Sequence, residues 1–70
     1  MRLIDKLLDE HDACHVVLGP GVAHNSNSLI CMDCKNRRGR PLFLAWVSAS
    51  DACELESAGM QLEAEYRAYS

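Results

Sequence analysis

The sequence predicts a small α+β domain with a helix at each end and a short antiparallel sheet between them. Residues 2–13 and 48–69 carry apolar side chains at the three- and four-residue spacing of an amphipathic helix. Short apolar runs, broken by glycine, proline and polar residues, fill the middle of the chain and are typical of strands. A chain of 70 residues has room for one such domain, which is expected to span residues 1–70.

The N-terminal segment "RLIDKLLDEHDA" predicts the first helix. One face of this helix collects four aliphatic side chains and a histidine, namely Leu3, Ile4, Leu7, Leu8 and His11. The opposite face carries Asp5, Asp9 and Asp12. The imidazole of His11 is therefore expected to point toward the core.

The next segment predicts two strands joined by a loop. "CHVVLGPG" contains the adjacent β-branched residues Val16 and Val17, and its Gly-Pro-Gly end is expected to stop the strand. "VAHNSNS", residues 22–28, is expected to be a polar loop. "SLIC", residues 28–31, is expected to form the second strand and to lead into a Cys-x-x-Cys pair.

The sequence after the cysteine pair predicts a hairpin. "KNRRGRP", residues 35–41, suits a turn, and "LFLAWV", residues 42–47, is apolar at both alternations, as a central strand would be. A helix over residues 28–37 is the alternative, and hydrophobic periodicity does not decide between the two. We favour the hairpin because it accounts for the segments on both sides of the cysteines.

The C-terminal segment predicts a long amphipathic helix. Ser48 with Asp51 resembles a helix-capping box. A stripe repeats at steps of three and four and comprises Ala52, Leu55, Gly59, Leu62, Tyr66 and Tyr69. This stripe is expected to pack across the sheet, and a homodimer through the same helix is the alternative.

The composition limits the classes of protein to which the chain can belong. The formal net charge is −3, and the basic residues are concentrated in the middle of the chain, which argues against a general nucleic-acid coat protein. Acidic residues interrupt the N-terminal segment, and no apolar run is long enough for a membrane span, so we expect a cytoplasmic protein without membrane contact. In that compartment the four cysteines are expected to be thiols or metal ligands.

Four residues match the spacing of a zinc site. His11, Cys14, Cys31 and Cys34 form the pattern H-x2-C-x16-C-x2-C, in which each two-residue gap suits a tight turn that delivers two ligands to one ion. A chain this short buries only a thin core, so a structural Zn²⁺ held in a zinc-knuckle turn would supply additional stability. The sequence therefore predicts a zinc-stabilised domain.

Other interpretations of the same residues stay open. His15, His24 or Cys53 could replace one of the four proposed ligands. Without metal, the cysteines would act as small buried apolar groups or, less plausibly, as a redox dithiol. A redox pair is expected at a helix N-terminus in a thioredoxin-like setting, which this order of elements does not provide.

The residue pattern predicts binding and not catalysis. A four-ligand zinc site has no open position for a substrate, and no catalytic motif accompanies it, so the chain is not expected to be an enzyme. The basic turn is expected to contact nucleic acid through Lys35, Arg37, Arg38 and Arg40, although the turn itself contains no aromatic residue for stacking on bases. A solvated turn facing the acidic helices of the same chain is the plainer interpretation.

A protein-interaction or regulatory role is the competing hypothesis. The acidic C-terminal helix, or the strip formed by Cys53, Met60 and Ala64, would then dock on another protein. Small size and acidic charge also suit the phage or mobile-element proteins that inhibit a host protein. That analogy rests on size and charge alone.

Overall fold

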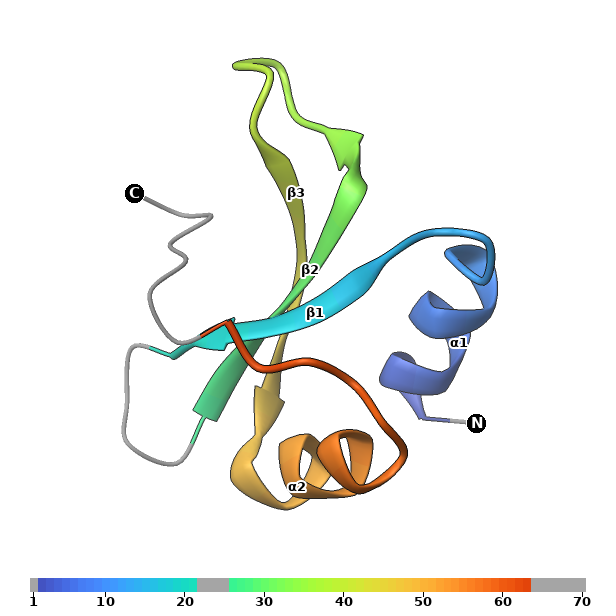
Figure 1. Ribbon diagram of the computed structural model, residues 1–70, viewed down its shortest axis with the longest axis vertical. Coiled ribbons are helices and arrows are strands. Elements are labelled where there is room, and N and C mark those ends of the chain that lie inside the picture. The colour runs from blue at the N-terminus through green and yellow to red at the C-terminus, as the bar shows by residue number, and fades with distance from the viewer. Residues whose placement is uncertain (1, 22–25, 64–70) are drawn as a thin grey trace.

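The chain folds as a small α+β domain. The computed structural model describes residues 2–21 and 26–63. Two helices and three strands follow one another in the order α1 (Leu3–Glu10), β1 (Val16–Pro20), β2 (Ser26–Lys35), β3 (Pro41–Ser48) and α2 (Ala49–Ser57). The strands form one antiparallel sheet in the order β1-β2-β3. Figure 1 shows the β2–β3 hairpin as the longest feature of the molecule, with β1 crossing it steeply.

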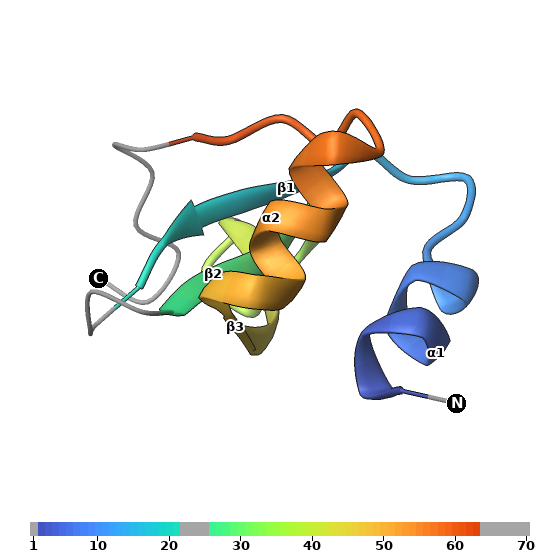
Figure 2. The same cartoon turned by 90° about the horizontal axis from the view of Figure 1, so that it is seen from below.

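The core lies between the sheet and the helices. α2 contacts β2 and β3, and α1 contacts β3; Figure 2 shows α2 lying across the strands with α1 beside them. The buried members of this cluster are Ile4, Leu18, Leu29, Val47, Ala52 and Leu55. A second cluster is built on Val17 and Ile30, which alternate with Leu18 and Leu29 along their strands and therefore face the other side of the sheet.

The first hairpin is longer than the sequence predicts. β1 continues through Gly19 and Pro20, and β2 begins at Ser26, within the segment predicted to be a polar loop. The loop prediction is wrong for Ser26 and Asn27, and polar side chains at this end of β2 bond to the backbone of β1. The amide of Asn27 donates to the Gly19 carbonyl over 3.0 Å, and the wholly buried Ser28 hydroxyl donates to the Pro20 carbonyl over 3.0 Å.

The predicted hairpin across the cysteine pair is confirmed. β2 and β3 pair from Ser26 opposite Ser48 to Lys35 opposite Pro41, which excludes the alternative helix over residues 28–37. The register is interrupted after Cys31, which pairs with Leu42, and the three residues that follow it have no partner on β3. The second cysteine of the pair therefore lies in a bulge between two paired positions.

The predicted long C-terminal helix is wrong. α2 has nine residues and ends at Ser57. Gly59 adopts a φ of 104°, and two backbone bonds close the helix end, from Gly59 N to the Glu56 carbonyl at 2.9 Å and from Met60 N to the Leu55 carbonyl at 3.0 Å. These are the two bonds of a Schellman motif, in which the glycine stands just beyond the last helical turn. The glycine that seemed to belong to a helical stripe in fact ends the helix.

The residues after α2 return to the sheet. Leu62 forms a parallel bridge with Leu18 of β1, whose amide donates to the Gln61 carbonyl over 2.9 Å. In the part of the predicted stripe that the structure describes, up to Leu62, only Ala52 and Leu55 are buried, and they pack in the domain's own core. The homodimer hypothesis therefore loses the helix on which it rested. The remaining members of the stripe, Tyr66 and Tyr69, and Ala64 of the proposed docking strip lie outside the described residues.

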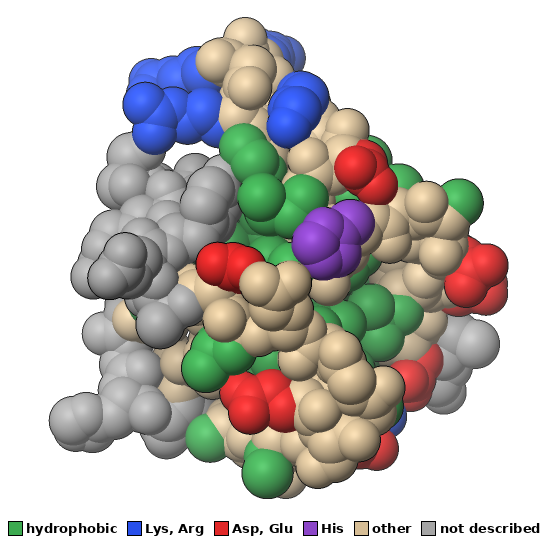
Figure 3. All heavy atoms as spheres, in the orientation of Figure 1, with side chains coloured by type: hydrophobic (Ala, Val, Ile, Leu, Met, Phe, Trp, Pro, Cys, Tyr) green, Lys and Arg blue, Asp and Glu red, His purple; other side chains and the backbone are tan. Residues whose placement is uncertain are grey.

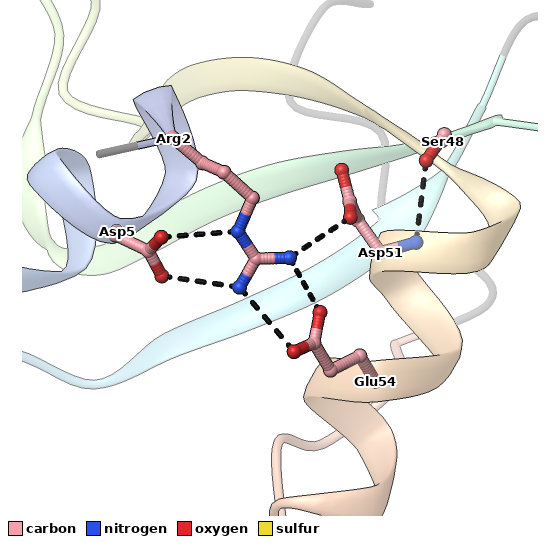
Figure 4. Close-up of polar contacts among 5 residues, drawn as sticks. All are labelled: Arg2, Asp5, Ser48, Asp51 and Glu54. Carbon is pink, nitrogen blue, oxygen red and sulfur yellow. Dashed lines mark hydrogen bonds and ion pairs between the residues drawn. The ribbon is translucent and has the colours of Figure 1, made fainter.

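An exposed ionic network joins the two helices. Arg2, the residue before α1, contacts Asp5 at 3.0 Å and reaches across to α2, where it contacts Asp51 at 3.2 Å and Glu54 at 2.5 Å (Figure 4). The hydrogen bonds to Glu54 and Asp5 raise the pKa of the Arg2 guanidinium. The hydrogen bond from Arg2 lowers the pKa of the Asp5 carboxyl. Ser48 caps α2 as predicted, because its hydroxyl accepts the Asp51 amide at 3.2 Å.

Candidate metal centre

The first two candidate ligands lie in a tight turn directly after α1. His11 follows the last helical residue and is half-buried. The helix ends one residue earlier than its apolar stripe suggested, so the imidazole belongs to the turn and not to the helix face. The amide of Cys14 donates to the His11 carbonyl over 2.9 Å, and this bond closes the turn around the two intervening residues.

The other two ligands come from the bulge in the β2–β3 hairpin. Cys31 is wholly buried in β2, and Cys34 is half-buried at the far end of the bulge. The amide of Cys34 donates to the Cys31 sulfur at 3.4 Å. An amide aimed at a sulfur favours the thiolate, which is the form of cysteine that binds metals.

The four side chains meet at one point in space. One ligand atom from each of His11, Cys14, Cys31 and Cys34 lies within 4.8 Å of all the others. The His11 Nδ1 and the Cys34 Sγ are 3.6 Å apart. In tetrahedral zinc sites, bond lengths of about 2.1 and 2.3 Å place ligand nitrogen and sulfur roughly 3.5–3.8 Å apart. The arrangement is therefore compatible with one zinc ion and four protein ligands.

The three thiols at this point influence one another's ionisation. Burial opposes ionisation of Cys31, but hydrogen bonds from Cys34 and Cys14 lower its pKa overall. The hydrogen bond to Cys31, together with burial, raises the pKa of Cys14 to about 11 and also raises that of Cys34. The pKa values of the three thiols therefore move apart, with that of Cys31 lowered and those of Cys14 and Cys34 raised. A divalent cation would allow all three to ionise.

Asp33, which lies between the two cysteines, ties the two halves of the site together. Its exposed side chain accepts the backbone N–H of His15 at 2.7 Å. In return, the His15 carbonyl accepts the amide of Met32 at 2.8 Å. These two bonds fix the residue after Cys14 against the hairpin. The Cys-x-x-Cys spacing gives no sign of this long-range contact, so the sequence did not identify Asp33 as a part of the site.

Two of the three rivals lie apart from the four candidate ligands. His15 is exposed and lies outside the ligand group, and Cys53 is exposed on α2. His24 lies outside the described residues. All four cysteines are free thiols. Cys31 and Cys34 lie in a strand and its bulge, so they lack the helix N-terminus that activates redox pairs.

The basic turn is the tip of the β2–β3 hairpin. Asn36 organises it, since its side-chain carbonyl accepts the amides of Arg38 at 2.9 Å and Arg40 at 3.1 Å, and Gly39 adopts a φ of 76°. All four predicted contact residues, Lys35, Arg37, Arg38 and Arg40, are exposed. They make no ion pair within residues 2–21 and 26–63, because the salt bridges there all belong to Arg2. Figure 3 shows basic side chains gathered at this end of the molecule.

An aromatic pair lies on β3 just beyond the basic turn. The rings of Phe43 and Trp46 are 4.8 Å apart at their centroids and tilted by 59°. Phe43 packs on the second apolar cluster, and Trp46 is 45% exposed. The sequence pattern predicts a central strand here, which is wrong because β3 lies at the edge of the sheet. The exposure of Phe43 and Trp46 depends on which side of the sheet the helices cover, which the sequence did not indicate.

No helix in the described part of the chain combines the length and apolar character needed to cross a membrane. Comparison of the chain with protein-family models, with curated proteins and with solved structures gives no match. Its function therefore has to be inferred from its own residues.

Proposed function

We propose that the protein is a small, non-catalytic module that is held together by a structural Zn²⁺ and contacts nucleic acid through its basic hairpin. The observation that carries the zinc assignment is the convergence of His11, Cys14, Cys31 and Cys34 within 4.8 Å. Three sulfurs and one nitrogen are a common ligand set of structural zinc. Four protein ligands leave no coordination position for a substrate, so the ion would serve folding and not catalysis.

The same ion would position the basic hairpin. Cys31 and Cys34 come from the hairpin itself, whereas His11 and Cys14 come from the turn after α1. Zinc would therefore anchor the hairpin, close to its tip, to the rest of the domain. Exposed arginines at the tip suit phosphate oxygens, which they bind in a bidentate manner. A localised basic tip on a chain of net charge −3 indicates a small contact with nucleic acid and not a coating of it.

Metal analysis tests the zinc assignment directly. Protein purified without chelator is expected to contain about one equivalent of zinc, and removal of the metal is expected to unfold or strongly destabilise it. Less than about half an equivalent would contradict the proposal. Replacement of the protein's zinc by Co²⁺ should give the visible absorption of a tetrahedral thiolate site.

A pair of cysteine variants tests the choice of ligands. Cys34→Ser removes a half-buried proposed ligand, and Cys53→Ser is its matched control on the exposed face of α2. The first is expected to cost about 4 kcal/mol or more of the free energy of unfolding, because loss of a structural metal is among the most destabilising single changes. The control should be nearly neutral. Equal effects from both variants would refute the ligand assignment.

Salt dependence tests the nucleic-acid contact. Binding of wild-type protein to a mixed-sequence oligonucleotide is expected to weaken as salt rises, with a slope set by the number of phosphates that the protein neutralises. The double variant Arg37→Ala/Arg38→Ala should lower that slope by about 0.7–0.9 for each phosphate that it no longer neutralises. Lys6→Ala, which removes an exposed cation from α1, is the control. Wild-type protein that shows no salt-dependent binding would overturn this half of the proposal.

The protein-interaction hypothesis has less support. It relied on a long acidic C-terminal helix, and α2 has only nine residues. Two of the acidic side chains on α2, Asp51 and Glu54, already pair with Arg2. The acidic surface of this helix is therefore partly neutralised within the domain.

A further inference from the structure

The basic tip of the hairpin leads directly into an aromatic surface. β3 begins at Pro41, immediately after Arg40, and carries Phe43 and then Trp46. At a rise of about 3.3 Å per residue, the backbones of Phe43 and Trp46 lie at most roughly 10 and 20 Å along the strand from Arg40. Their rings converge to a centroid distance of 4.8 Å. Cations that bind phosphates and rings that stack on bases therefore follow one another along a single strand.

Contacts with neighbouring side chains hold the rings of Phe43 and Trp46 in place. Phe43 packs against the cluster of Val17 and Ile30, both of which are wholly buried. The tilted contact with Phe43 restricts the rotation of the Trp46 indole. The indole is nonetheless 45% exposed, the most among the aromatic side chains that the structure describes. A fixed, partly exposed indole is a preorganised surface for a flat apolar partner.

We propose that the nucleic acid bound by this protein is single-stranded, with its backbone on the arginines of the hairpin tip and an unpaired base stacked on Trp46. This inference rests on the proposed contact between the hairpin and nucleic acid, and it adds the form of the ligand. Bases inside a duplex stack on one another and do not offer a free face, whereas a single strand can place its bases on aromatic side chains.

The distribution of charge favours the same ligand. Four of the exposed cations are gathered at the tip, and none of them forms an ion pair with an acidic side chain within the described residues. Asp33, the acidic residue nearest in sequence, accepts the amide of His15. A few phosphate contacts would bind weakly by themselves, so stacking would contribute a large share of the affinity. Stacking accepts every base, and little sequence preference is therefore expected.

The test compares single-stranded with duplex ligands and follows the fluorescence of Trp46, the only tryptophan in the chain. A thymidine homopolymer and a uridine homopolymer of about 12 nucleotides are the single-stranded ligands, and a blunt DNA duplex of the same length is the comparison. Single strands should bind at least fivefold more tightly than the duplex and should quench the indole fluorescence, since one stacked base changes affinity by about fivefold or more.

Two substitutions at one position separate stacking from packing. Trp46→Leu is expected to weaken single-strand binding by about fivefold or more and to leave duplex binding unchanged, whereas Trp46→Phe should restore most of the affinity. Leu3→Ala, which removes another exposed apolar side chain, on α1, should have no effect. Zinc content and unfolding midpoints of each variant establish that the domain is intact.

The outcomes distinguish this inference from the function on which it rests. Wild-type protein that fails to bind any of the three ligands in a salt-dependent manner contradicts the nucleic-acid contact itself. Salt-dependent binding with equal affinity for single strand and duplex, without quenching of Trp46, leaves that contact intact and overturns the single-strand inference. Should Trp46→Leu fail to fold, the quenching and affinity ratio of the wild type decide the question alone.

Discussion

At the scale of single residues, spacing in the sequence identifies the side chains that could bind a metal. It does not identify the residues that hold those side chains in place. The two gaps of two residues identified His11, Cys14, Cys31 and Cys34, and these residues do converge. Asp33 could not be identified in this way, because its partner lies 18 residues away and the contact involves a backbone amide. Side chains that hold a ligand-bearing segment in place influence metal affinity nearly as strongly as some ligands do.

Asp33 is predicted to position the segment that carries Cys14. Asp33→Ala should lower zinc affinity about tenfold or more, because the His15 amide loses its acceptor and the turn after α1 is less well held. Asp33→Asn keeps an acceptor oxygen and should retain most of the affinity. Competition with a chromophoric chelator measures both, and Asp9→Ala on the exposed side of α1 controls for the removal of one negative charge. Unchanged affinity in Asp33→Ala would show that the contact is incidental.

At the scale of elements, strands and helices were predictable in kind, but their ends were not. The apolar periodicity of α1 and the three strands followed from the sequence. The ends of the strands depend on hydrogen bonds between strands, which the sequence does not reveal. β2 begins earlier than predicted because β1 offers carbonyl acceptors to Asn27 and Ser28. Gly59 fitted a helical stripe by spacing, yet the same residue in a left-handed conformation stops a helix. Periodicity alone cannot separate these two roles.

Gly59→Ala distinguishes a helix end from a helix interior by the sign of its effect. At a φ of 104° an alanine is strained although its Cβ would meet no atom within 4 Å, so the substitution should destabilise the domain by about 1–2 kcal/mol. In a continuous helix the same change would stabilise it by roughly 0.5–1 kcal/mol. Urea unfolding of the zinc-loaded protein gives the sign, with Ser57→Ala as the control in the last helical turn. Stabilisation by Gly59→Ala would restore the long helix.

At the scale of the whole molecule, two long-range connections hold α1 in place. The ionic network of Arg2 joins its N-terminal end to α2, and the turn that carries His11 and Cys14 joins its C-terminal end to the hairpin. The first connection is exposed to solvent and is expected to contribute little. Zinc would therefore be the stronger of these two connections and would add to the packing of Ile4 in the core, so that metal binding and folding are coupled.

That coupling predicts that zinc binding releases protons and strengthens as pH rises. Hydrogen bonding to Cys31 raises the pKa of Cys14 to about 11 and raises that of Cys34 above its usual value, so both carry a proton at about pH 7. Zinc requires both as thiolates, and each proton released makes the affinity increase about tenfold per pH unit. Titration calorimetry in buffers of different ionisation enthalpy should count at least two protons released by the wild type and about one fewer by Cys34→Ser. An affinity that does not change between about pH 6 and 8 would mean that these thiols are not the ligands.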